Sequence, residues 1–343
     1  MDASANSSLV AVSALCHRVF SLPQDRLVAE MPASPGPVTA PWCLTLLTEE
    51  LEADSLQQLQ EFLSAREWRV TAVDILASRP DCTAIRLQLE AELDFHAARE
   101  ALLAPAQATG LELVLQPGAS QRAPKLACFD MDSTLIQAEV IDELAKIAGV
   151  GEQVADITAA AMRGELDFQQ SFRKRMRLLR GFTEKSLSEI APQLPLMTGA
   201  QRLLKALRAL DCKTAILSGG FTYFAHYLKD NHLAVDFVHA NQLEFEGGAL
   251  TGGVIDPIVD GARKAHLLQA LAAELELSLD QVIAVGDGAN DLPMLALGAL
   301  GIAFHAKPKV RAEAPQAIDG FGLDAALYLF GLNDLQIEAL LQD

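Results

Sequence analysis

Two aspartates stand two positions apart, directly after an uncharged stretch near the middle of the chain. Leu126 to Phe129 are typical of a buried strand, and Asp130-Met131-Asp132 follow them. Such a pair of carboxylates could supply a nucleophile and a proton donor. Two ionised carboxylates this close repel each other, and burial adds to the cost unless a cation compensates. The spacing therefore predicts a catalytic site that also holds positive charge.

Two further motifs have the same layout, in which polar residues and glycines follow an apolar strand at once. They are AILSGGF, with Ser218, Gly219 and Gly220, and IAVGDGAND, with Asp287, Asn290 and Asp291. The carboxyl ends of strands in an open parallel sheet meet at one crevice. We therefore expect these side chains to lie beside Asp130, with Lys264 of the helical run ARKAHLLQALAAEL as the candidate cation.

Each motif by itself has a more ordinary explanation. A lone DxD also occurs in nucleotide-sugar transferases and on protein surfaces, and SGG is most often only a turn. GDGAND can be a loop whose Asn290 or Asp291 caps a helix. A single lysine such as Lys264 is usually solvated. The combination, in this order and with each motif at the end of a strand or helix, favours a functional site.

The residue types indicate phosphoryl transfer. Several carboxylates without a histidine or thiolate form an all-oxygen site, which suits magnesium, and magnesium would let Asp130, Asp132 and Asp287 coexist as anions. A serine hydroxyl, glycine amides and a lysine ammonium suit a phosphate dianion. One aspartate can attack phosphorus to form an aspartyl phosphate, and the second can protonate the leaving oxygen and later deprotonate water.

These motifs resemble those of the haloacid dehalogenase-like superfamily, whose DxDx[TV] signature matches DMDST. Longer segments are similar to the phosphoserine phosphatase family within it, over about Lys125 to Gly322. They are FDMDSTLIQAEVIDELAKIAG, LDFQQSFRKRMRLLRG, ILSGGF and GDGANDLPML. The resemblance implies a magnesium-dependent hydrolysis of O-phospho-L-serine to L-serine and phosphate, the final step of serine biosynthesis.

The resemblance also implies a role for each residue of the motifs. Asp130 would be the nucleophile and Asp132 the general acid and base. Ser218, Gly219, Gly220 and Lys264 would hold the phosphate. Magnesium would be bound by Asp130, the backbone carbonyl of Asp132, and Asp287. Asp291 would support the lysine and the metal, and Asn290 the phosphoryl group or a nearby water.

Substrate selection is expected from residues of an inserted cap. Phosphoserine carries an ammonium that Glu139 could receive and a carboxylate that Arg175 could clamp bidentately. The resemblance matches both positions and places Phe168 and Met162 near the substrate. The ordinary alternatives are a solvated basic helix face for Arg175 and a surface acid for Glu139.

The chain divides into segments with different patterns. From Lys125 onward, apolar strands alternate with long helical segments, which predicts an α/β fold with a Rossmann-like parallel sheet in a phosphatase domain at 125–343. Candidate strands are 214–217, 282–285 and 301–304, and Leu243 to Leu250 reads as a hairpin. No convincing strand pattern lies at about 138–199, which we interpret as a helical cap.

The segment 41–117 has the order strand, helix, strand, strand, helix, strand, which is the ferredoxin-like βαββαβ pattern of an α+β domain. By pattern and position it resembles the ACT-type modules attached to some phosphoserine phosphatases. No glycine-rich turn follows its first strand, where Thr48-Glu49-Glu50-Leu51 stand, so a structural or homodimerising role is favoured over serine sensing. Residues 1–40 form an N-terminal segment with helical tendency and a proline-rich linker.

Composition excludes several classes of partner. The formal net charge is -18 at pH 7, which argues against nucleic acid and anionic membrane. No stretch reaches the ~18 apolar residues of a membrane helix. Five scattered cysteines without a CxxC pair favour a reducing cytoplasm.

Three other functions remain open at this stage. The nearest is a magnesium phosphatase or phosphotransferase for another small metabolite, such as phosphohomoserine or a sugar phosphate. A signalling module phosphorylated on Asp130 would need neither Asp132 nor a cap. A DxD glycosyltransferase would leave Lys264 and GDGAND without a role.

Overall fold

The computed structural model describes residues 3–20 and 34–342, with side chains from residue 10 onward. The chain forms two compact units, one of Met1–Ala123 together with Ile318–Asp343 and one of Pro124–Ala317. The sequence-based boundary assigned 318–343 to the phosphatase domain, whereas the contacts group this segment with the N-terminal residues. The proposed domain limits stay a prediction. The predicted linker at 30–41 lies partly outside the described residues.

The N-terminal unit contains a four-stranded antiparallel sheet with the order β2-β3-β1-β4. Its strands are β1 Trp42–Thr48, β2 Arg69–Arg79, β3 Cys82–Glu90 and β4 Glu112–Pro117. Helix α2 (Ala53–Ala65) follows β1, and α3 (Phe95–Thr109) follows β3. Asp94 caps α3 by accepting from the amide of Ala97 at 2.9 Å. The predicted βαββαβ order is confirmed.

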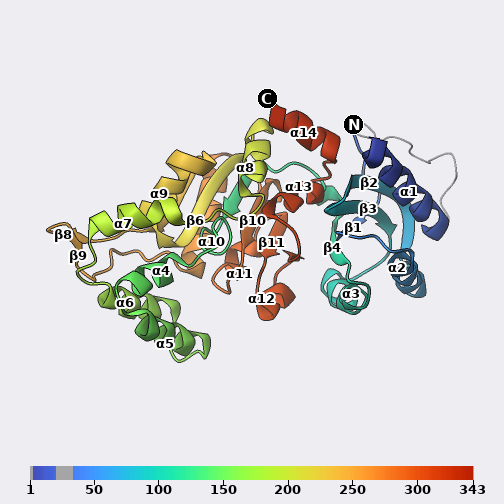
Figure 1. Cartoon of the computed structure of the whole chain (residues 1–343). Helices are drawn as coiled ribbons and strands as arrows, with labels where there is room; N and C mark the ends of the chain where they lie inside the picture. The colour runs from blue at the N-terminus through green and yellow to red at the C-terminus, as the bar shows by residue number, and fades with distance from the viewer. Residues whose placement is uncertain (1–2, 21–33, 343) are drawn as a thin grey trace. The chain divides into compact units, whose positions relative to one another are not determined.

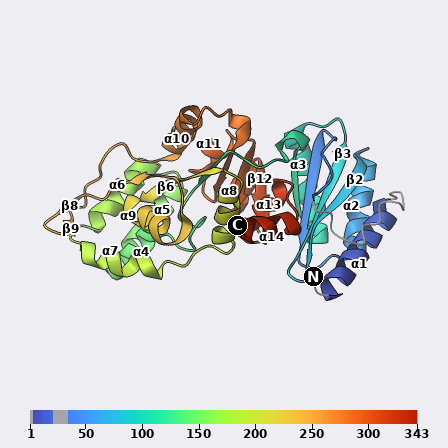
Figure 2. The same cartoon turned by 90° about the horizontal axis from the view of Figure 1, so that it is seen from above.

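The two faces of this sheet differ in character. Leu44 and Leu87, which pair across β1 and β3, belong to an apolar core shared with α1 (Ala3–Phe20), α2 and α3. The alternate residues, such as Thr45 and Arg86, point to the opposite face and are nevertheless buried. Figure 2 shows the strands between α1 and α2 on one side and α13 (Ala326–Leu329) and α14 (Asp334–Gln342) on the other.

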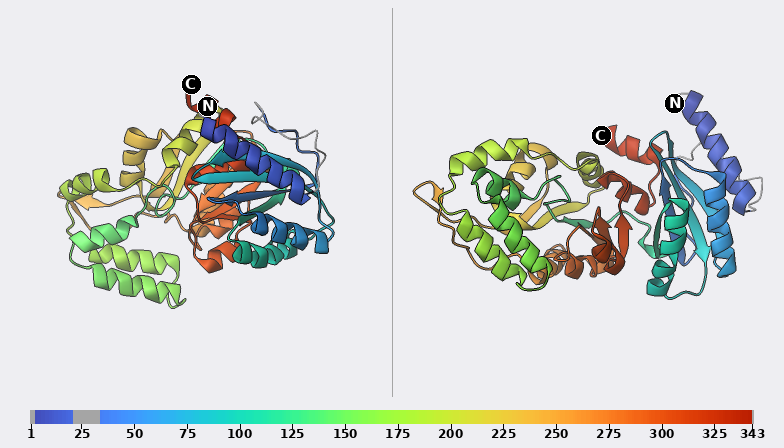
Figure 3. Two further views of the ribbon diagram at one scale, coloured as in Figure 1. Left: turned by 45° about the vertical axis from the view of Figure 1, so that its right-hand side comes forward. Right: turned by 60° about the horizontal axis from the view of Figure 1, so that its bottom comes forward.

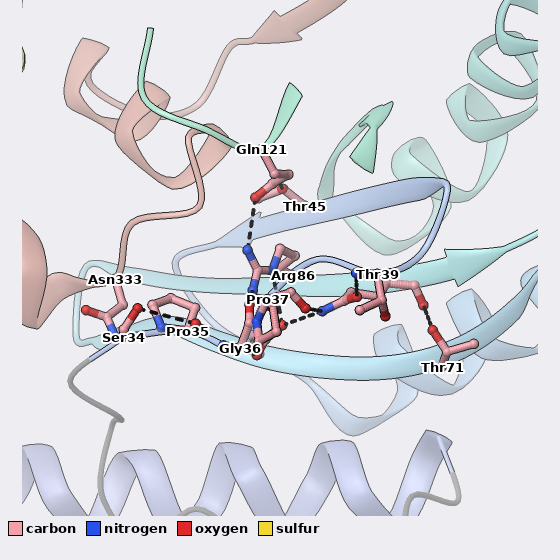
Figure 4. A network of polar contacts seen from close by, with 12 residues as sticks. Ser34, Pro35, Gly36, Pro37, Thr39, Thr45, Thr71, Arg86, Gln121 and Asn333 are labelled. Atoms are coloured by element: carbon pink, nitrogen blue, oxygen red, sulfur yellow. Dashed lines mark hydrogen bonds and ion pairs between the residues drawn. The ribbon is translucent and has the colours of Figure 1, made fainter. Parts of the chain in front are cut away.

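A buried arginine organises the polar face of this sheet (Figure 4). Arg86 donates from Nη2 to the carbonyl of Gly36 at 2.8 Å and to Asp74 at 2.9 Å, and from Nη1 to Gln121 at 3.2 Å. Gln116 donates to the carbonyl of Leu329 at 3.0 Å. Both the segment before β1 and the C-terminal segment are therefore held on this face, which satisfies its buried polar groups.

The second unit is built on a six-stranded sheet with the order β12-β11-β10-β5-β6-β7. The strands are β5 Leu126–Phe129, β6 Lys213–Phe221, β7 Phe237–Asn241, β10 Val282–Gly286, β11 Leu300–Phe304 and β12 Gln316–Ile318. The five strands from β11 to β7 run parallel. The predicted Rossmann-like α/β fold is confirmed. Strands β7 and β12 had no counterpart among the predicted strands.

Helices cover the sheet and enclose its core. They are α8 Ala200–Ala209, α9 Thr222–Leu228, α10 Gly261–Glu274, α11 Leu292–Leu295 and α12 Pro308–Glu313. Leu268 of α10 packs with Leu126, Leu217 and Ala284 of the central strands. Burial on both faces explains why these strands are continuously apolar rather than alternating.

The stretch between β5 and α8 forms the inserted cap. It contains α4 Val140–Ile147, α5 Gly151–Met162, α6 Phe168–Leu178 and α7 Glu184–Ile190. Helices α5 and α6 run side by side in both views of Figure 3, and in Figure 1 they lie with α4 to one side of β6 and β10. The predicted hairpin is confirmed as β8 (Phe245–Glu246) and β9 (Ala249–Leu250). Among the described residues, no helix is both long and apolar enough to cross a membrane.

Candidate active site

Asp130 begins the site at the carboxyl end of β5. Its amide donates to the carbonyl of Val285 in β10 at 2.9 Å, which extends the parallel pairing of these strands by one residue. One oxygen of its carboxylate accepts from the amide of Met131 at 2.7 Å. Asp130 and Asp132 are both buried. The strand therefore delivers the two carboxylates into the protein rather than to the surface.

Lys264 supplies the cation that the aspartate pair requires. Its side chain is fully buried, and its Nζ lies 2.8 Å from Asp130 Oδ2 and 2.6 Å from Asp291 Oδ1. Burial alone would lower the pKa of Lys264, but the charges and hydrogen bonds of Asp130 and Asp291 raise it above its ordinary value. The lysine is thus a permanent cation that orients the Asp130 carboxylate.

One lysine does not balance the negative charge at this place. Oxygens of Asp130, Asp287 and Asp291 lie within 4.8 Å of one another. Burial, followed by the charges of Asp130 and Asp291, raises the pKa of Asp287 to about 8. Burial, followed by the charge of Asp130, raises the pKa of Asp291 to about 7. A close set of hard oxygen donors with excess negative charge fits a divalent cation such as Mg²⁺.

The turn after β10 positions Asp287 and Asp291. Asp291 Oδ2 accepts from the amides of Asp287 at 3.1 Å and Gly288 at 2.9 Å, so the side chain folds back on its own loop. A Cβ at Gly286 would lie 2.5 Å from the Asp291 carboxyl, which leaves room only for glycine. The Thr134 hydroxyl donates to Asp287 Oδ1 at 3.3 Å. Thr134 was not among the predicted site residues, although it is the last residue of the DxDx[TV] match.

The end of β6 forms the candidate phosphate loop, defined as Ser218, Gly219 and Gly220. Ser218 is buried, and its Oγ accepts from the amide of Gly220 at 2.9 Å. The hydroxyl hydrogen of Ser218 is therefore left to donate elsewhere. A Cβ at Gly220 would lie 2.7 Å from Asp132 Oδ2 and 2.8 Å from Met131 Cε. This close approach places the loop directly against the proposed acid and requires glycine.

Burial and nearby negative charge favour the protonated form of Asp132. Its pKa is raised well above the ordinary range, first by burial and then by the charges of Glu139 and Asp130. The amide of Val140, the first residue of α4, donates to Asp132 Oδ1 at 3.4 Å. Glu139 stands just before α4 and accepts from the Ser133 hydroxyl at 2.9 Å. A neutral carboxyl beside a carboxylate is the arrangement that a general acid next to a nucleophile needs.

Arg175 projects from α6 toward the acidic residues. Its Nε is buried without a hydrogen-bond partner in the described part of the chain. Burial lowers the pKa of Arg175, while the charges of Asp142, Glu139 and Asp132 act against that change. Arg175 is half-buried, and its buried Nε and the nearby carboxylates distinguish it from a solvated surface residue. Its guanidinium has capacity to bind an anion.

The other predicted substrate residues lie in different surroundings. The ring of Phe168 faces Gly219, because a Cβ at Gly219 would lie 2.9 Å from Phe168 Cζ. Met162 is 66% exposed at the end of α5, with its sulfur 3.8 Å from Lys307 Nζ. Asn290 packs against glycines of its own loop and of α10, with Oδ1 close to Gly288. The structure thus brings Phe168 to the phosphate loop, whereas the substrate roles of Met162 and Asn290 stay predictions.

A buried asparagine beside the site was not among the residues predicted from the sequence. Asn241, the last residue of β7, donates to the carbonyl of Gly219 at 2.8 Å and accepts from the amide of Val259 at 2.8 Å. Strand β7 is only partly buried, so it lacks the apolar run that marked the other central strands.

Known proteins share this architecture and its motifs. A profile of the haloacid dehalogenase-like hydrolases matches residues 127–296. The phosphoserine phosphatase of Streptomyces coelicolor is 39% identical over 297 residues, which cover 86% of this chain and 72% of that protein. The crystal structure of a probable phosphoserine phosphatase from Vibrio cholerae is 35% identical with a TM-score of 0.70, covering 96% of this chain and 95% of that one. The chain belongs to the phosphoserine phosphatase family.

Not every phosphoserine phosphatase is matched over its whole length. The curated phosphoserine phosphatase of Vibrio cholerae is 50% identical over 200 residues, which make up 58% of this chain and 61% of that protein. The chain thus spans less than two thirds of that relative. The profile match at residues 127–296 includes the two aspartates, the phosphate loop and Lys264, whose geometry is described above.

Proposed function

We propose that this chain hydrolyses O-phospho-L-serine to L-serine and phosphate, the last step of serine biosynthesis, in the cytoplasm. The observation that carries the proposal is the buried contact of Lys264 Nζ with Asp130 Oδ2 at 2.8 Å. Asp132, whose pKa is raised by burial, and the glycine loop lie beside it. This arrangement combines a positioned nucleophile, an acid and a phosphate cradle. Five cysteines, all free and buried, fit a reducing compartment.

Substrate binding follows from the charges around the site. The phosphate would lie against Ser218, whose hydroxyl hydrogen is free to donate, and against Lys264. The substrate carboxylate would meet the Arg175 guanidinium, and its ammonium would meet Glu139. Phe168 would close over the phosphate loop. The binding roles of Met162 and Asn290 are part of the same proposal.

The first chemical step transfers the phosphoryl group to Asp130. A carboxylate oxygen of Asp130 attacks phosphorus as the bond from phosphorus to the serine oxygen breaks. Asp132 would give its proton to that leaving oxygen, since burial raises its pKa and so favours the protonated form before the step. Lys264 and the amide of Met131 hold the two oxygens of Asp130 during the attack.

The second step regenerates the enzyme. Asp132, now a carboxylate, accepts a proton from water as the water oxygen bonds to phosphorus and the bond to Asp130 breaks. Phosphate leaves, and Asp132 is again protonated. Asp130 and Asp287, with the backbone carbonyl of Asp132, are proposed to hold Mg²⁺, and Asp291 supports them. Bound magnesium would neutralise the negative charge that these carboxylates and the phosphoryl group bring together.

Phosphate release from L-phosphoserine tests the proposal. The chain should release phosphate with Mg²⁺ and stop with EDTA, and it should prefer phosphoserine to phosphohomoserine, a sugar phosphate and p-nitrophenyl phosphate. The matched control is Asp130→Asn, which keeps the shape but should form no phosphoenzyme. A preference for another ester would show that phosphoserine is not the substrate. Phosphoenzyme formed by Asp130→Asn would show that Asp130 is not the nucleophile.

For the N-terminal unit we propose a homodimerising role. Both faces of its sheet are covered, by helices on one and by residues around Arg86 and Leu329 on the other. The edge strands β2 and β4 therefore remain as pairing surfaces. Analytical ultracentrifugation of the whole chain should show a dimer, and a monomer at micromolar concentration would contradict this role.

A further inference from the structure

The segment Asp256–Asp260 lies between the cap and the phosphate loop, and we call it the coupling loop. It follows the β8–β9 hairpin and leads directly into α10, whose first turn carries Lys264. Its residues contact the cap on one side and the sheet on the other. These contacts suggest a function for residues that the catalytic scheme leaves unused.

Two side chains of α6 bind the coupling loop. Gln169 Nε2 donates to Asp260 Oδ2 at 2.7 Å, and Arg173 Nη2 donates to Asp256 Oδ1 at 2.6 Å. Gln169 and Arg173 are four positions apart, so they lie on the same face of the helix. Both pairs reach solvent, since the side chains of Arg173 and Asp256 are 38% and 62% exposed. Exposed polar pairs of this kind are weak and reversible.

The other end of α6 is attached through the backbone. The amide of Gly181 donates to the carbonyl of Leu250 at 2.8 Å, and the amide of Leu250 donates to the carbonyl of Phe182 at 2.8 Å. Gly252 also packs closely on the helix end, because a Cβ there would lie 3.3 Å from Arg177 Cα. The helix is therefore anchored at its C-terminal end, and Gln169 and Arg173 hold its N-terminal half by side chains that can separate.

Asn241 connects the coupling loop to the phosphate loop. It is buried, accepts from the amide of Val259, and donates to the carbonyl of Gly219. The same peptide group carries the amide of Gly220, which donates to Ser218 Oγ. Asn241 therefore orients the peptide that in turn orients the serine hydroxyl. Asp260 adds a second connection, because its Oδ1 accepts from the amide of Arg263 in the first turn of α10.

We propose that Gln169 and Arg173 latch the cap onto the coupling loop, and that Asn241 is a positioning residue that transmits the latched state to the phosphate loop. The inference rests on the proposed phosphatase function and adds to it a means of coupling closure to catalysis. Latching brings Phe168, which is on the same helix, over Gly219. At the same time, Asn241 holds the carbonyl of Gly219 through its hydrogen bond. The phosphate loop would be fully ordered only when the cap is closed.

Charge exchange at the latch provides the first test. Arg173→Asp and Asp256→Arg should each raise KM for phosphoserine about three- to ten-fold, and the double variant should recover most of that loss because the pair is restored. KM for p-nitrophenyl phosphate should rise as well, because every phosphate ester uses the phosphate loop that the latched cap orders. Lys174→Asp, on the next position of α6, is the matched control. Failure of the double variant to recover would overturn the latch.

Hydrogen–deuterium exchange tests the transmission without depending on any substrate. In full-length Gln169→Ala/Arg173→Ala protein, exchange should increase at 168–173 and also at 218–220, relative to Lys174→Ala. An increase confined to 168–173 would refute the transmission, and no increase would refute the latch. These results stand even if wild-type protein prefers another ester, whereas failure to hydrolyse phosphoserine would refute only the proposed function.

Asn241→Asp tests the positioning role with a nearly isosteric change. The carboxylate can still accept from Val259 but cannot donate to the Gly219 carbonyl. We expect kcat to fall about ten-fold or more with both phosphoserine and p-nitrophenyl phosphate, because every phosphate ester uses the phosphate loop. An unchanged kcat with both esters would show that Asn241 does not have this role. The role would also be refuted if kcat fell equally with both esters while hydrogen–deuterium exchange at 218–220 in Asn241→Asp stayed as in wild type.

Discussion

Replacing Lys264 by methionine should make the stability of the metal-free protein strongly dependent on pH. Methionine keeps much of the lysine's length but removes the cation that contacts both Asp130 and Asp291, which are 6% and 0% exposed. Removing one partner from a buried ion pair typically costs about 3–5 kcal/mol, because the remaining charge is buried alone. In a unit of this size that loss corresponds to a decrease in melting temperature of roughly 6–20 °C.

The pH dependence of this loss follows from the carboxylates. The pKa of Asp291 is about 7 with the lysine present, far above its usual 3.8. A carboxyl whose pKa is raised by folding contributes stability that is lost as pH rises through the folded pKa. Without the lysine, the Asp291 carboxyl should retain its proton to higher pH, because its pKa would rise further. The decrease in the free energy of unfolding caused by Lys264→Met should therefore be small near pH 5 and reach its full size near pH 8.

Thermal and urea unfolding in EDTA at pH 5 and pH 8 measure this difference. Lys174→Met on the exposed side of α6 is the matched control and should unfold as wild type does. The reasoning would be refuted if Lys264→Met lowered the free energy of unfolding equally at both pH values, or by less than about 1 kcal/mol at pH 8. Either result would mean that Lys264 does not compensate buried carboxylates.

Three further predictions concern the proton, the substrate and the metal. Asp132→Asn should lower phosphoserine turnover about 10²- to 10⁴-fold, while phosphoenzyme should still form from p-nitrophenyl phosphate because its leaving group needs little protonation. Rapid turnover of phosphoserine by this variant would contradict the acid role of Asp132. Arg175→Ala should reduce kcat/KM for phosphoserine by orders of magnitude and spare p-nitrophenyl phosphate, and equal losses with both esters would make Arg175 structural. The pKa of Asp287 is about 8, so the folded state binds this proton more tightly and loses stability as pH rises from about 4 to 8. Because magnesium competes with that proton, the rise in melting temperature on adding Mg²⁺ should grow from pH 6 to pH 8, and a constant rise would argue against Asp287 as a ligand.

The fold was predictable wherever burial leaves a regular mark on the residue pattern. Strands β5, β6, β10 and β11 are covered on both faces, so they appear as apolar runs ended by polar residues. The ferredoxin-like order was visible from alternation in β3 and from the cap at Asp94. Strand β7, with four of its five residues only partly buried, and the three-residue β12 carry too little pattern to be recognised.

The sequence determined the chemical groups of this protein. The aspartate pair, the Ser-Gly-Gly loop, Lys264 and the GDGAND turn could be assigned to one crevice because parallel strands end at a common edge. Tertiary structure alone decided how those groups behave. The burial that raises the pKa of Asp132 and the bridge that Asn241 makes between Gly219 and Val259 arise from segments far apart in the chain. The same is true of the surroundings of Arg175 Nε, which has no hydrogen-bond partner among the described residues. Local sequence cannot encode them, because the electric field and the hydrogen-bond partners at each atom come from whichever segments folding brings beside it.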